Sequence, residues 1–219
     1  MSPKATPSRV PFVIQRRGEE AAPANLFMTG APGRRRLHYR DEDPRDRDLH
    51  GVLWARCSFN PVDSRKQLTG TPEWKMMHPF RQRITMGALH CQDCSAPART
   101  PLGYVFLAGP HFTVPDQGPM LTSQPPVCAR HVRSSARLCP HLDDNPTVFL
   151  VRSAPLYGVI GTLYGYSEDG IEVVAEPDEP LPYGHPNLPT LLASQLVRRL
   201  SSYEITTVDR LMTDLAEAA

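Results

Sequence analysis

Two short pairs of residues supply side chains that bind metal ions. Cys91 and Cys94 form a Cys-x-x-Cys pair, and Cys128 and His131 form a Cys-x-x-His pair further along the chain. Three thiolates and one imidazole suit tetrahedral Zn²⁺, because each pair can bind from a single turn while the intervening segment closes a loop. The spacing therefore predicts a structural zinc site. A site closed by four protein ligands has no open position for a substrate.

Three further potential ligands, His90, Cys139 and His141, lie near these pairs. On a continuous helix Cys139 lies about 12 Å along the axis from His131 and cannot reach the same ion. We expect Cys139 to pack as a core thiol on the apolar face of that helix. If the helix ends early, Cys139 could replace His131 as the fourth metal ligand. An iron–sulfur cluster would prefer four thiolates, so the histidine favours zinc.

The segments between and after the ligand pairs position them. Residues 100–107 and 111–114 are two short β-favouring runs that predict a hairpin, and a helix is expected from Cys128 to Leu138, ended by Pro140. This order over residues 90–139 resembles the treble-clef class of zinc fingers. The resemblance implies a fold element and no single activity, because treble clefs occur in nucleases, ribosomal proteins, DNA-binding regulators and protein-interaction modules. The rest of the chain is similar only to uncharacterised actinobacterial proteins, which implies no function.

Composition limits the function classes. The chain has 219 residues, 40% of them hydrophobic, which is enough for a globular core. Its 24 prolines predict many loops, and its net charge of +1 gives no global field for nucleic acid. There is no apolar run of signal-peptide or membrane-spanning length, and five cysteines fit a reducing compartment, so we expect a cytoplasmic protein.

The chain divides into three expected parts. Residues 1–48 read as an extended or disordered arm, residues 49–186 as a zinc-containing α+β core, and residues 187–219 as a C-terminal helical segment. The predicted fold class is α+β, with a treble-clef-like finger packed on a small antiparallel β-sheet and C-terminal helices. Strands are expected at residues 52–59, 81–89, 147–152, 156–164 and 171–175, and helices at residues 73–79, 191–200 and 208–218, the last capped by Thr207.

Arginines offer a second possible function. Arg130, Arg133 and Arg137 recur at helical spacing on the face opposite the apolar one, where they would contact phosphates or remain solvated. Arg34, Arg35 and Arg36 form a basic triplet on the arm. The acidic run at residues 41–48 and the near-neutral net charge oppose nucleic-acid binding, so a solvated face is favoured.

The sequence shows little evidence of a catalytic site. His111 and His141 do not form the paired-histidine motif of His-Asn-His nucleases, and no nucleophile elbow, phosphate loop or dinucleotide fingerprint occurs. A reactive thiol at Cys57, whose pKa Arg56 would lower, or at Cys139 is a further possibility, but isolated cysteines in apolar strands are usually inert. The sequence thus predicts a non-enzymatic, zinc-stabilised interaction or regulatory protein, with an unknown macromolecular partner and with protein favoured over nucleic acid. A nucleic-acid-binding protein is the alternative, and a zinc-dependent enzyme such as a nuclease is the third reading.

Overall fold

The protein is described by a computed structural model that covers residues 10–22, 25–109, 112, 120–139, 142, 146–168 and 170–218. Its strands are β1 (Ile14–Arg16), β2 (Leu26–Thr29), β3 (Arg36–Tyr39), β4 (Leu53–Trp54), β5 (Pro72–Met77), β6 (Tyr104–Ala108), β7 (Met120–Thr122), β8 (Thr147–Ser153), β9 (Leu156–Ser167), β10 (Gly170–Ala175), β11 (Leu181–Pro182) and β12 (Leu191–Thr206). The helices are α1 (Pro79–Ala88), α2 (Val132–Leu138) and α3 (Val208–Glu217), with short 3₁₀ turns η1 (Pro44–Asp46), η2 (Ala129–His131) and η3 (Leu188–Thr190).

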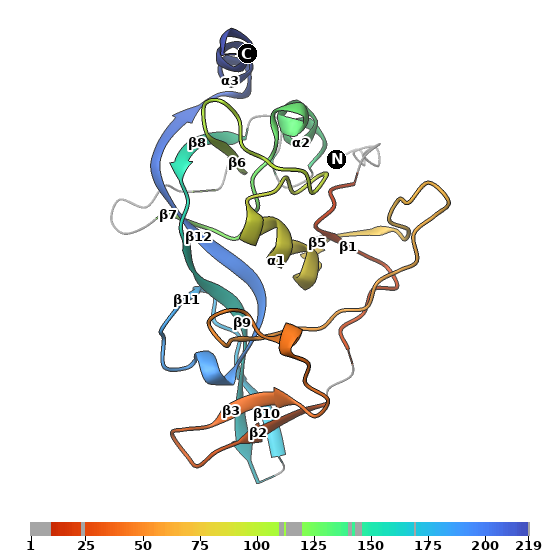
Figure 1. Ribbon diagram of the computed structural model, residues 1–219, viewed down its shortest axis with the longest axis vertical. Coiled ribbons are helices and arrows are strands. Elements are labelled where there is room, and N and C mark those ends of the chain that lie inside the picture. The colour runs from red at the N-terminus through yellow and green to blue at the C-terminus, as the bar shows by residue number, and fades with distance from the viewer. Residues whose placement is uncertain are drawn as a thin grey trace, which may run out of the picture.

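An eight-stranded, mostly antiparallel sheet forms the centre of the molecule. Its main order is β10-β9-β12-β8-β6, with β11 on β9 and with β4 and β7 on β12. The 16-residue strand β12 organises it: its first half pairs with β9 and β4, its middle with β7, and its last residues with β8. Figure 1 shows β12 as a long curved ribbon that leads into α3 at the C-terminus. The α+β prediction is confirmed at this level, as a mixed fold with few helices.

Strand β12 replaces the helix predicted over residues 191–200, so that prediction is wrong. The pattern of Leu192, Leu196 and Leu200 resembled one helical face, but the β-pairing register shifts twice within this segment, between Ala193 and Gln195 and between Val197 and Arg198. Such bulges break the two-residue alternation that would have identified a strand. A spacing of four places leucines on one face of a strand as well as of a helix, so it did not distinguish the two elements.

Residues 73–89 also reverse their predicted structure. The expected helix at 73–79 is strand β5, because β1 pairs with it through Ile14 and Met77. The expected strand at 81–89 belongs instead to helix α1, which begins at Pro79 with His78 as its N-cap. Proline is favoured in the first turn of a helix, where its missing N–H costs no hydrogen bond. The inward face of α1 buries the polar residues Arg81, Gln82 and Thr85, which concealed its helical pattern.

The described parts of the N-terminal arm are ordered, contrary to the extended or disordered reading. Val13 and Leu37 are 1% and 0% exposed, and β2 and β3 form a hairpin. Two short apolar segments of the arm, at residues 10–14 and 26–28, pack on the protein itself. A buried ion pair joins the arm to α1, since both terminal guanidinium nitrogens of Arg81 donate to the Glu19 carboxylate. The division of the chain into three domains stays a prediction.

Several other elements agree with the sequence. Strands β8, β9 and β10 lie where strands were expected, and β9 and β10 form an antiparallel pair in which Ser167 lies opposite Gly170. Helix α3 starts after Thr207, whose side chain accepts a hydrogen bond from the Arg210 N–H. Of the strand expected at residues 52–59, only Leu53 and Trp54 form β4. None of the helices formed by the described residues is long and apolar enough to cross a membrane.

Candidate metal centre

The first ligand pair lies in a tight turn after α1. Within it the Ser95 N–H donates to the Cys91 carbonyl oxygen over 2.8 Å, and the Cys91 N–H donates to the Ala96 carbonyl oxygen over 2.7 Å. Ser95 adopts a φ of 59°, in the left-handed region, which lets the chain reverse at this point. The turn consequently brings the Cys91 and Cys94 side chains to the same side.

The second ligand pair lies at the start of α2. Cys128 precedes the 3₁₀ turn η2, and the His131 N–H donates to the Cys128 carbonyl oxygen over 2.8 Å. One turn therefore carries both ligands, as the Cys-x-x-His spacing predicted. Helix α2 continues to Leu138, with Cys139 as its C-cap, so the helix does not end early.

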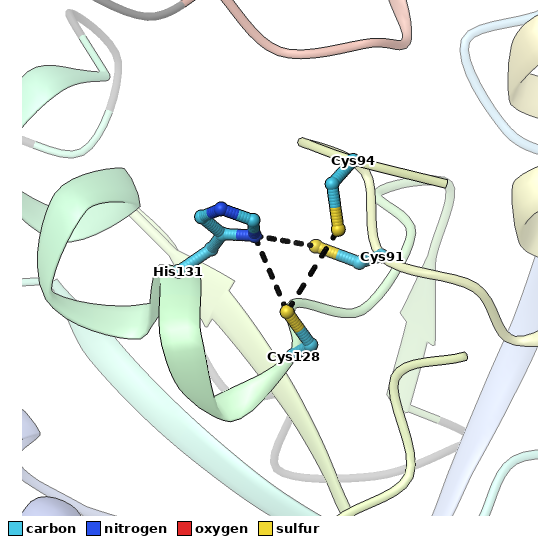
Figure 2. Close-up of side chains that lie close together, drawn as sticks. All are labelled: Cys91, Cys94, Cys128 and His131. Atoms are coloured by element: carbon cyan, nitrogen blue, oxygen red, sulfur yellow. Dashed lines mark hydrogen bonds between the residues drawn. The ribbon is translucent and has the colours of Figure 1, made fainter. Parts of the chain in front are cut away.

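The four ligand atoms converge (Figure 2). They all lie within 4.8 Å of one another. The Cys94 and Cys128 sulfurs are 3.9 Å apart, and the His131 Nδ1 is 3.2 Å from the Cys128 sulfur and 3.6 Å from that of Cys91. A tetrahedron with Zn–S bonds of about 2.3 Å and Zn–N bonds of about 2.05 Å separates two sulfurs by about 3.8 Å and a sulfur from a nitrogen by about 3.6 Å. The donor set and its spacing fit a metal ion of the size of Zn²⁺.

Burial makes the site dependent on a cation. Cys91, Cys128 and His131 are 0%, 8% and 6% exposed, and Cys94 is half-buried. Burial raises the pKa of the Cys91 thiol to about 12, because a thiolate in apolar surroundings loses its hydration. A bound cation reverses this effect by stabilising the thiolates directly. Three cysteines and a histidine are a ligand set typical of structural zinc.

Asp93, inside the first ligand turn, connects the two halves of the site. The Ser135 hydroxyl on α2 donates to its carboxylate over 2.5 Å, and Asp93 is 8% exposed. The Phe12 and Val13 N–H groups donate to the carbonyl oxygens of Asp93 and Gln92, so the N-terminal segment is tied to the same turn. The sequence alone does not predict this role of Asp93. An acidic residue between two cysteine ligands was the available signal.

The metal site borders one of the main hydrophobic clusters. Cys91 and Cys128 pack in a buried group that includes Val105 and Val148 on the sheet and Leu211 on α3. Metal binding would therefore hold together the first ligand turn, α2, α3 and the edge of the sheet.

The competing ligands lie elsewhere. The metal-ligand group found among the described residues contains neither His90 nor Cys139. The His90 N–H donates to the Thr85 carbonyl oxygen at the end of α1, and Cys139 packs half-buried against the cluster beside the metal site, as expected for a core thiol. His111 and His141 lie outside the described residues.

The structure separates the two predicted groups of arginines. Arg130, Arg133 and Arg137 are all exposed on η2 and α2, and Arg133 lies 3.9 Å from the Asp209 carboxylate. The triplet from Arg34 to Arg36 lies at the β2–β3 hairpin, where Arg35 donates to the Tyr166 carbonyl oxygen. Figure 1 shows β3 and α2 toward opposite ends of the long axis, so the two groups do not form one surface.

Cys57 lacks the activation that its neighbour suggested. The Arg56 guanidinium forms ion pairs with Asp46 and Asp41, at 2.6 Å and 2.9 Å. Burial raises the pKa of the half-buried Cys57 thiol, and the nearby Glu19 carboxylate adds to this effect. This environment disfavours the thiolate, so the structure gives no support to the possible activation by Arg56.

Comparisons with known proteins returned nothing: no protein-family model, no curated protein and no solved structure matches this chain.

Proposed function

We propose that this chain is a non-enzymatic interaction or regulatory protein whose fold is held by Zn²⁺ at Cys91, Cys94, Cys128 and His131. The convergence of four ligand atoms in a largely buried site carries the proposal. Four protein ligands complete a tetrahedron and leave no position for a substrate or an activated water. In this proposal zinc acts as a brace, and function resides on a surface of the protein.

We also propose that the zinc module is a treble clef. Its first ligand turn and its ligand-bearing helix occur in the expected order. The predicted central hairpin does not support the proposal, because β6 pairs with β8, and residues 111–114 lie outside the described part except for Phe112. Pairing of residues 111–114 with β6 would support the treble clef, and nuclear magnetic resonance measurements of contacts between these two segments would test it.

The outward face of α1 is our candidate surface for a protein partner. This helix buries three polar side chains beside Met86 and exposes two large apolar ones, unlike an ordinary surface helix, whose outer face is polar. Phe80 and Ile84, one turn apart, are 50% and 37% exposed, and Phe59 packs edge-on against Phe80 while remaining 55% exposed. Contiguous exposed apolar groups beside polar ones are typical of protein-interaction sites.

Metal analysis tests the zinc brace. The native protein should contain one zinc per chain, and exhaustive chelation should lower its melting temperature strongly, because metal binding is coupled to folding. Returning zinc should restore the melt. A metal-free protein with an unchanged melting temperature would overturn the proposal.

Chemical crosslinking in the native cell extract tests the candidate surface. Phe80→Glu should remove those crosslinked proteins that depend on α1. Val173→Glu on β10 is the matched control, because Val173 is 54% exposed and lies on another element. Equal crosslinking by both variants would show that α1 is not the interaction surface.

A second candidate function, nucleic-acid binding, rests on the exposed stripe of Arg130, Arg133 and Arg137. It predicts affinity for duplex DNA or RNA that falls steeply with salt, with a slope of about 0.9 per phosphate neutralised on DNA. Replacing the three arginines by alanine should abolish binding and remove the salt dependence. The same change at Arg34, Arg35 and Arg36 is the control, because these residues lie at a distant hairpin.

A further inference from the structure

A cavity of about 440 Å³ lies beside the metal centre and is not part of it. One wall comes from β1 and β5, including Ile14 and Trp74, and another from the metal-binding turn through Gln92. The floor is the sheet, with residues of β6, β7, β8 and β12. Its volume falls within the range of about 300–1,000 Å³ that is typical of sites for small organic molecules.

The floor of the cavity is apolar and well ordered. Phe106, Met120, Phe149 and Leu200 line it, and they are only 1–4% exposed because they also form one buried hydrophobic cluster. Side chains held by such packing give a preformed apolar surface. Because these four residues are already almost fully buried, the gain on binding would come mainly from half-buried lining residues such as Ile14, Trp74 and Met77, at roughly 25 cal/mol for each Å² of apolar surface removed from water.

Gln92 is the first polar group of the cavity that points to a ligand. Its side chain lines the cavity, and the residue is only 8% exposed. Among the described residues its side-chain amide has no hydrogen-bond partner, although its backbone groups bond to Pro126 and Val13. Neither amide atom belongs to the described side-chain atoms that are sealed from solvent without a partner, so the amide reaches the open space of the cavity, where a ligand can replace its water.

Lys75 on β5 sets the charge of the site. It is the only charged residue among the described lining residues, and its side chain is exposed, which places it at the mouth. No described carboxylate forms an ion pair with it. One cation at the rim of an apolar cavity favours a ligand with a single negative charge at one end.

We propose that this cavity binds a small amphiphilic carboxylate. Its apolar body lies on Phe106, Met120, Phe149 and Leu200, its carboxylate pairs with Lys75, and the Gln92 amide N–H donates to one of its oxygens. Because β1, β5 and the metal-binding turn together form the walls, occupancy would also stabilise their contact. This inference does not depend on which macromolecule the protein contacts.

Titration calorimetry with three probes of equal chain length tests the ligand class. Decanoate should bind the zinc-loaded protein at one site per chain, decanol should bind about fivefold more weakly, and decyltrimethylammonium should bind weakest. All three are used below their micelle concentrations. Equal affinities would overturn the carboxylate assignment, and no binding of any probe would overturn the site.

Variants of Lys75 locate the charge interaction without disturbing the core. Lys75→Ala should reduce the difference between decanoate and decanol to less than twofold, and Lys75→Glu should reverse their order. Lys66→Glu is the matched control, because Lys66 is also exposed and does not line the cavity. An equal loss of decanoate affinity in Lys66→Glu would show a nonspecific charge effect and overturn the assignment.

A cavity-filling variant tests the location. Ala108→Phe on β6 should abolish binding while zinc content and the thermal melt stay unchanged, whereas Ala88→Phe on the exposed face of α1 should bind normally. If Ala108→Phe fails to fold, Trp74 provides a second measurement, because it lines the cavity. Decanoate should change the protein fluorescence, and Trp74→Phe should remove that change. Normal binding by a folded Ala108→Phe, or a change that persists in Trp74→Phe, would place the ligand elsewhere.

Discussion

The Ser135 hydroxyl on α2 donates a hydrogen bond of 2.5 Å to the carboxylate of Asp93, which lies between Cys91 and Cys94. This bond joins the two segments that carry the four metal ligands, and both residues are at least 92% buried. The bond fixes the relative position of the two ligand pairs through side chains that are not metal ligands. Residues in such positions tune metal affinity through geometry.

Replacing Ser135 by alanine should therefore weaken the metal site while leaving all four ligands in place. A hydrogen bond to a buried charged group contributes about 1.5–3 kcal/mol, and we expect a loss of that size in the free energy of unfolding of the zinc form. Zinc affinity, measured by competition with a chelator, should fall about 10- to 100-fold. Ser134→Ala is the control, because both hydroxyls bond to the His131 carbonyl oxygen, whereas among the described residues only that of Ser135 also bonds to Asp93. Equal effects of the two variants would contradict a special role for Asp93.

Removing one ligand should have a larger effect. Cys128→Ser replaces a thiolate by a poor zinc ligand in a buried position, so the protein should lose its zinc and much of its tertiary structure. Cys57→Ser removes a cysteine outside the site and should keep one zinc per chain, with a loss of about 1 kcal/mol or less. Metal analysis and near-ultraviolet circular dichroism measure both. Retention of zinc by Cys128→Ser would show that Cys128 is not a ligand.

The local features of the metal site were predictable because they are encoded within a few residues. Each ligand pair lies in one turn, and Thr207 caps α3 from the adjacent position. The failures come from long-range contacts. Residues 72–77 form a strand only because Ile14, far away in sequence, pairs with Met77, and α1 buries Gln82 because its amide bonds to Leu196 on β12. The residues of the cavity share no pattern in sequence, since the fold alone brings them together.

The buried ion pair between Glu19 and Arg81 should contribute strongly to the stability of the contact between the N-terminal arm and α1. Glu19→Gln leaves the Arg81 guanidinium buried without its counter-charge, and breaking such a pair costs about 3–5 kcal/mol. The double variant Glu19→Leu with Arg81→Met should be less destabilised than the sum of its single changes. Glu73→Gln breaks the exposed pair with Arg17 and should cost less than about 1 kcal/mol. Urea unfolding distinguishes these cases, and equal losses for Glu19→Gln and Glu73→Gln would contradict the role assigned to the buried pair.

His78 should make stability depend on pH. Burial lowers the pKa of its imidazole, and the nearby Arg81 guanidinium lowers it further. The ordinary histidine pKa is about 6.5, so below that pH the unfolded chain binds a proton more readily than the folded protein does. The free energy of unfolding should thus be highest above pH 6.5 and fall as the pH drops toward the pKa of His78 in the folded state, below which it levels off.

Urea unfolding between pH 8 and pH 5.5, with zinc in excess to keep the metal site loaded, measures this dependence. His78→Gln should be less stable at pH 8, because it loses the bond to the Ser58 carbonyl oxygen and the stacking with Phe59, but its stability should change less with pH. His50→Gln is the matched control for replacing a histidine by glutamine, because His50 is exposed. If His78→Gln kept the full pH dependence, the titrating group would have to be a different residue.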